Sequence, residues 1–105
     1  MKITIDNTME IGGHKIEIDL DPKLSRDNNG GLNELYQNKI HINPDRPSDM
    51  LDLALIHEVA HSINVVYCQN NLSEDEIRGM AEGMLQFIRS YLGIEFCWEN
   101  IPISK

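Results

Sequence analysis

The run HEVAH, residues 57–61, constrains this chain more than any other feature of its sequence. It lies within LIHEVAHSI, residues 55–63, whose apolar residues favour a helix. Two histidines four residues apart on a helix project in nearly the same direction and lie about 6 Å apart along its axis. Two imidazole nitrogens can then reach one Zn²⁺ ion at about 2.0–2.1 Å. The motif therefore predicts that His57 and His61 are zinc ligands.

Glu58 follows the first histidine, so the helix rotates it by one residue away from the ligand direction. A carboxylate in that position lies beside the metal, where it can take a proton from metal-bound water. The motif thus predicts Glu58 as a general base. The alternative is a helix that carries the motif by chance and binds no metal. The apolar flanks of the motif and the acidic segment that follows it favour the metal site.

The composition indicates one ordinary globular domain, residues 1–105, with 41% hydrophobic and 25% charged residues. The formal net charge is −8, and no cluster of Lys and Arg gathers on one face, so nucleic acid and anionic membranes are not expected partners. The sequence shows no run of 18 apolar residues and no charged-then-apolar leader. Cys68 and Cys97 form no CxxC motif and are expected to be thiols. We expect a cytoplasmic protein, and the sequence does not predict its oligomeric state.

Residues 2–43 have the pattern of short strands. Ile3 and Ile5 alternate with polar residues, and Gly12-Gly13 predicts a hairpin turn between strands 9–11 and 14–20. A loop at 27–31 precedes a second expected hairpin, with strands 32–36 and 39–42 joined by residues 37–38.

From residue 48 the apolar period becomes helical. A first helix is expected from a Ser48 cap to about Tyr67, with one apolar stripe formed by Leu55, Val59, Ile63 and Val66. His57 and His61 fall on the opposite side. The segment 73–76, SEDE, is a capping box that predicts a second helix ending near Gly93. Residues 94–98 alternate like a short strand that lays Phe96 or Trp98 over the core.

A catalytic zinc needs three protein ligands and one open position. The extended motif HExxHxxGxxH is absent, because Asn64 and Tyr67 stand at its glycine and third histidine. An acid from the second helix is then required, and the candidates are Glu74, Glu76 and Glu82. Glu76 already has a capping role, Glu74 is in the exposed first turn, and Glu82 lies in mid-helix beside the apolar stripe. Hydrophobic periodicity alone does not establish that Glu82 is the third ligand.

The run HEVAHSI followed by LSEDEIRGMAEGMLQFIRSYLG resembles the small metallopeptidase-like proteins of phages and prophages. These are compact gluzincin-type domains related in plan to the ImmA/IrrE peptidases. The resemblance covers about residues 9–92 by pattern. It implies that Glu82, within Ala-Glu-Gly, is the third ligand. The sequence departs from the thermolysin-like pattern, because Gln86 stands where that pattern has an Asp.

The expected architecture is α+β: a small, twisted, mainly antiparallel sheet packed on the HExxH helix, with the Glu82 helix closing the other side of the metal. The expected function is that of a zinc metallopeptidase of gluzincin type. A peptide or protein substrate would pair with an edge strand at 32–36. Tyr67 or Tyr91 could stabilise an oxyanion, and Asn64 could orient a ligand or a loop. The alternative function is a zinc-bearing binding or regulatory protein with little or no turnover.

Overall fold

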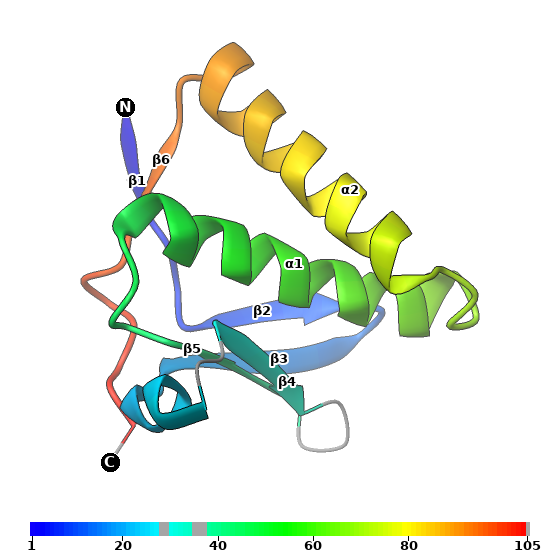
Figure 1. Cartoon of the computed structure of the whole chain (residues 1–105), viewed down its shortest axis with the longest axis horizontal. Coiled ribbons are helices and arrows are strands. Elements are labelled where there is room, and N and C mark those ends of the chain that lie inside the picture. Colours follow the sequence, from blue (N-terminus) through cyan, green and yellow to red (C-terminus); the bar gives the residue numbers. More distant parts are fainter. Residues whose placement is uncertain (28–29, 35–37, 105) are drawn as a thin grey trace.

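Two helices and a small mixed sheet make up the computed structural model, which describes residues 1–27, 30–34 and 38–104 (Figure 1). The predicted α+β class is confirmed. Helix α1 (Ser48–Tyr67) crosses one face of the sheet, and α2 (Glu74–Gln86) lies on the side of α1 away from the sheet. Neither helix in this part of the chain has the length and apolar character that a membrane span requires.

The main sheet has the strand order β2-β3-β5-β4. Its strands are β2 (Thr8–Ile11), β3 (His14–Leu20), β4 (Gly31–Glu34) and β5 (Lys39–Ile42). The predicted first hairpin is confirmed, because β2 and β3 pair antiparallel across Gly12 and Gly13. Both glycines have positive φ, 59° and 82°, as a type I′ turn requires, and glycine adopts this conformation at little cost.

The sheet is mixed, whereas the sequence suggested mainly antiparallel pairing. The two inner strands, β3 and β5, run parallel with Leu20 opposite Ile42. The chain makes this possible by passing through the short helix η1 (Pro22–Asp27) and the outer strand β4 before it returns as β5. β4 and β5 pair antiparallel, as predicted for the second hairpin, with Gly31 opposite Ile42. Residues 35–37, which include the end of the predicted strand 32–36 and the first residue of the predicted turn 37–38, lie outside the described residues.

The strands predicted at the two ends of the chain pair with each other. β1 (Lys2–Thr4) and β6 (Glu95–Cys97) form a separate parallel pair beside the main sheet. Both Phe96 and Trp98 pack against the core, as expected for the C-terminal segment. The N-terminal ammonium adds a hydrogen bond of 2.8 Å to the Gly93 carbonyl.

The core lies between the sheet and α1. It consists of Ile11, Ile16, Ile18, Leu20, Ile40, Ile42, Leu55 and Ile101. Of the predicted apolar stripe on α1, Leu55 is buried, but Ile63 and Val66 each remain 37% exposed. α1 has neighbours on two sides, with the sheet on one and α2 on the other (Figure 1), and Ile63 lies along an open groove between the two helices. A helix with two packed sides does not show one simple stripe.

The starts of the two helices differ. Ser48 is the first helical residue of α1, and the cap is Pro47, which forms no side-chain capping bond, so the predicted Ser48 cap is wrong. The proline ring holds φ near the −57° observed at Pro47, and proline has no backbone N–H that would need a hydrogen-bond partner. The predicted capping box of α2 is confirmed: Ser73 accepts from the Glu76 amide at 3.1 Å, and Glu76 accepts from the Ser73 amide at 2.8 Å.

α2 continues as a single π-helical turn, η3 (Phe87–Tyr91), before Gly93 turns the chain at φ 66°. The helical segment therefore ends near Gly93, as the sequence predicted. η3 brings Arg89 to the buried carboxylate of Asp52 on α1 at 2.6 Å. The same carboxylate accepts from the Trp98 indole at 2.7 Å. Asp52 thereby ties α1 to both the end of the second helix and the C-terminal segment.

Beyond the start of α2, the two helices diverge (Figure 1). Ile77 and Ala81 of α2 are buried, but Met84, farther along, is 51% exposed. Between the diverging helices lies an apolar groove of about 520 Å³. Residues from α1, α2, β2 and β6 line it, among them Ile63, Met84 and Phe96.

Candidate metal centre

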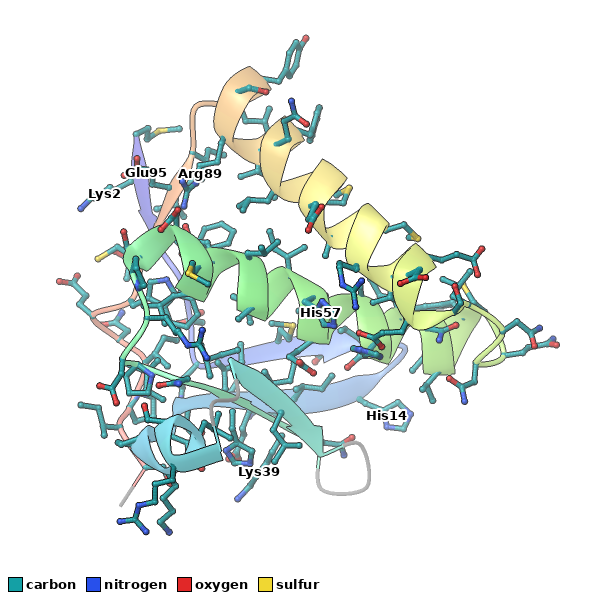
Figure 2. All side chains as sticks on the ribbon, viewed as in Figure 1. Lys2, His14, Lys39, His57, Arg89 and Glu95 are labelled. Atoms are coloured by element: carbon teal, nitrogen blue, oxygen red, sulfur yellow. The ribbon has the colours of Figure 1, made fainter. Side chains whose placement is uncertain are left out.

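His57 and His61 lie on one face of α1, as the i, i+4 spacing predicts. Their Nε2 atoms are 3.1 Å apart and their ring centroids 4.9 Å apart. The side chains are partly accessible, with 24% and 30% of their surfaces exposed. Figure 2 shows His57 in the region where α1 approaches the first turns of α2. The histidine face of α1 is therefore covered in part by the second helix.

Glu74, in the first turn of α2, completes the cluster. Its Oε1 atom lies 2.9 Å from Nε2 of His57, and its Oε2 atom lies 3.2 Å from Nε2 of His61. These are the three residues that could share one metal ion among those the structure describes. Ligand atoms around a tetrahedral zinc at about 2.0–2.1 Å would lie roughly 3.3–3.4 Å from one another. The observed separations approach that spacing.

Glu82, the acid that the family resemblance favoured, is exposed on α2 and is not part of this cluster. The structure brings Glu74 to the histidines instead. The sequence argument set Glu74 aside because the first turn of a helix is usually exposed, and indeed 53% of its side chain is. The short connection 68–73 keeps the start of the second helix near the end of the first, but it does not set the angle between the two helices.

Asn64 holds that connection in place. It is 2% exposed and its Oδ1 atom accepts from the Leu72 amide at 3.0 Å. Its Nδ2 atom donates to Oδ1 of Asn70 at 3.2 Å. Gln69 and Asn70 both adopt positive φ, 55° and 58°, which turns the chain sharply after α1. Asn64 thus positions the loop that delivers Glu74, which is one of the two roles the sequence left open for it.

Glu58 points from α1 toward the start of β4. A Cβ atom placed on Gly31 would lie 3.2 Å from Cγ of Glu58 and 3.3 Å from its Oε1. A larger residue at position 31 would therefore press on the carboxylate. Burial raises the pKa of Glu58 above its ordinary value of 4.5, the nearby His61 and His57 partly offset this, and Glu74 adds to it. A carboxylate with a raised pKa is better matched to accepting a proton near neutral pH.

Neither tyrosine considered for oxyanion stabilisation gains support from its position. The Tyr67 hydroxyl is directed toward the Gly12 turn at the end of the sheet. Tyr91 lies in η3, where its ring stacks on Phe87 at 5.5 Å and it is 79% exposed.

The other two histidines lie on the sheet. His14 is exposed (Figure 2). His41 is buried, with 8% of its surface exposed. Its Nδ1 atom lies 2.6 Å from Oδ1 of Asp19 on the neighbouring strand. A hydrogen-bonded carboxylate lowers the free-energy cost of burying an imidazole, and the strand pattern alone does not reveal this partner.

A second, smaller pocket of about 250 Å³ adjoins the cluster. His57 and Glu58 both line it, together with Gly30 and Gly31 at the start of β4. Arg46 in the loop before α1 and Met50, Leu53 and Ala54 on α1 also line it. The pocket therefore continues the metal-cluster face of α1 toward the N-terminal end of that helix.

Comparisons of the chain with protein-family models, curated proteins and solved structures gave no match. The function is accordingly argued from the residues and their geometry.

Proposed function

We propose that this protein is a zinc-dependent peptidase, with zinc held by His57, His61 and Glu74 and with Glu58 as general base. The observation that carries the proposal is the convergence of three donor side chains, two Nε2 atoms and one carboxylate, within 2.9–3.2 Å of one another. Two histidines and one glutamate form a donor set typical of catalytic zinc in peptidases. The proposal replaces Glu82 by Glu74 as third ligand.

The donor set fits zinc better than calcium or magnesium, because those ions prefer oxygen ligands. When bound, zinc with three protein ligands supplies a Lewis acid with an open position for water or a substrate carbonyl. Glu58 follows a ligand in sequence but is not in the ligand cluster. It is therefore assigned the proton transfers: it accepts a proton from the attacking water and later gives it to the leaving amine.

The substrate is proposed to bind along β4, the outer strand of the sheet next to α1. An extended peptide can add to an outer strand through main-chain hydrogen bonds. Gly31 brings the start of this strand close to Glu58, so a peptide paired there would pass the candidate base. A cytoplasmic location and a phage or prophage origin remain expectations from the sequence.

The test is peptide cleavage that depends on zinc. The purified chain is stripped with a chelator, reloaded with zinc, and incubated with a peptide library whose products are read by mass spectrometry. The proposal expects cleavage in the native and reloaded samples and none in the stripped sample. Cleavage that is equal in all three samples would count against a metal-dependent mechanism.

A second candidate function is a zinc-bearing binding protein without turnover. The apolar groove of about 520 Å³ between α1 and α2 favours it, since a groove of this size can bind an apolar ligand or segment. Zinc retention with no cleavage of any library peptide would support this second function over the first.

A further inference from the structure

Among the described residues that line the pocket beside the metal cluster, one is an arginine. Arg46 stands in the loop between β5 and α1 and is partly buried. Met50, Leu53 and Ala54 provide an apolar wall. Such a lining suits a side chain with a short apolar stem and an anionic end, because arginine presents paired N–H donors that match a carboxylate.

We take a bound peptide to pair antiparallel with β4, because antiparallel pairing is slightly more stable per residue than parallel pairing. A peptide antiparallel to β4 would run from the Glu34 end of that strand toward the Gly31 end. Gly30 and Gly31 line the pocket, and Gly31 lies beside Glu58. A peptide bond held at Glu58 would therefore direct its C-terminal side toward Arg46.

We propose that Arg46 binds a carboxylate on the substrate residue that follows the cleaved bond. The inference rests on the proposed function and adds a substrate class to it. The carboxylate can be the side chain of Glu or Asp, or the free C-terminus of the peptide. Arg46 also takes part in an interaction within the chain. A guanidinium has five N–H donors, so one such interaction is compatible with binding a carboxylate as well.

The net charge of −8 repels an acidic substrate at long range. A preference for a carboxylate must therefore come from a cation in direct contact with it. At physiological ionic strength, charges separated by more than about 8 Å are largely screened from one another. The distributed acids therefore affect chiefly the rate of encounter, whereas a directly contacting guanidinium affects affinity. One charge-assisted hydrogen bond in a partly buried pocket gives a preference of about tenfold.

The experiment uses zinc-loaded protein and short amino-acid probes that carry a hydroxamate, a zinc-binding group, on their N-terminal side. Four probes are compared by calorimetry: Glu amide, Gln amide, Leu amide, and Leu with a free carboxylate. Tighter binding of Glu amide than Gln amide identifies the side-chain carboxylate as the source. Tighter binding of free Leu than Leu amide identifies the C-terminus. Cleavage of peptides varied in the same way provides a second measurement.

The variants are Arg46→Gln, Arg46→Glu and the matched control Arg26→Gln, which removes an exposed arginine in η1. Arg46→Gln should abolish the preference for a carboxylate, and the control should keep it. Arg46→Glu should reverse it in favour of an additional fifth probe, Lys amide. Equal binding of all four probes to wild type would overturn the inference even if the Arg46 variants fail to fold. Zinc-dependent cleavage without any carboxylate preference would leave the proposed function intact and overturn the inference. Failure to bind zinc would overturn both.

Discussion

The Nε2 atom of His57 lies 2.9 Å from Oε1 of Glu74, seventeen residues later in the chain. This contact joins the middle of α1 to the first turn of α2. It depends on Asn64, whose side chain holds the intervening loop through Asn70 and Leu72. A metal site at this place therefore links the two helices, and its ligands and its loop can be tested separately.

We expect about one zinc ion per chain and loss of that zinc on replacement of a histidine. His61→Ala removes one of three donor atoms in the cluster, so the variant should retain little zinc after gentle dialysis. His14→Ala is the control, because His14 is exposed on the sheet. Elemental analysis by mass spectrometry gives the zinc content of both variants. Full zinc content in His61→Ala would rule out the proposed site.

We expect Glu74→Gln, but not Glu82→Gln, to weaken zinc binding. Glu74→Gln removes an anionic carboxylate whose oxygens lie 2.9 Å from Nε2 of His57 and 3.2 Å from Nε2 of His61. Glu82 lies exposed on the same helix, so Glu82→Gln makes the same chemical change outside the cluster. Competition with a zinc-binding dye measures both affinities. Weaker zinc binding by Glu82→Gln and unchanged binding by Glu74→Gln would instead support Glu82, the ligand that the family resemblance implied.

We expect Glu58→Gln to keep the fold and the zinc but to lower peptide cleavage at least about a hundredfold, because glutamine cannot accept the proton. The measurement is initial rate on a cleaved library peptide, with zinc content and circular dichroism on the same samples. Cleavage at the wild-type rate by Glu58→Gln would assign the proton transfer to another group.

We expect Asp52→Ala to destabilise the chain by about 2–4 kcal/mol, because it leaves partners of a buried carboxylate without an acceptor. Asp52 is 2% exposed and accepts from both Arg89 and Trp98. Asp49→Ala, on an exposed position in the first turn of the same helix, should cost less than about 1 kcal/mol. Urea unfolding followed by Trp98 fluorescence measures both changes. Equal losses would mean that the Asp52 contacts add no stability.

We expect the capping box of α2 to make stability depend on pH in the acid range. Hydrogen bonds from the backbone and side chain of Ser73 lower the pKa of Glu76 below its ordinary value of 4.5. A lowered folded-state pKa means that the contribution of ionised Glu76 is complete above the unfolded-state pKa. It is lost as pH falls through the folded-state value. The stability difference between wild type and Glu76→Gln should therefore shrink below about pH 4.5. Urea midpoints of both proteins measured across that range provide the check, and a constant difference would contradict it.

The sequence by itself determined the local features. Helical geometry places His57 and His61 on one face whatever surrounds them. The box at Ser73 and Glu76 fixes the start of α2, and the pair Gly12-Gly13 fixes the first hairpin, because each depends on residues adjacent in the chain.

Tertiary structure decided which acid meets the histidines. Periodicity describes the faces of one helix but not the angle at which a second helix crosses it. Because α2 starts close to α1 and then diverges from it, its first turn reaches the cluster, and Glu82, two turns later, does not (Figure 1). The parallel pairings of β1 with β6 and of β3 with β5 were also settled only by the fold. These contacts join residues distant in the chain, and their geometry depends on how the whole core packs.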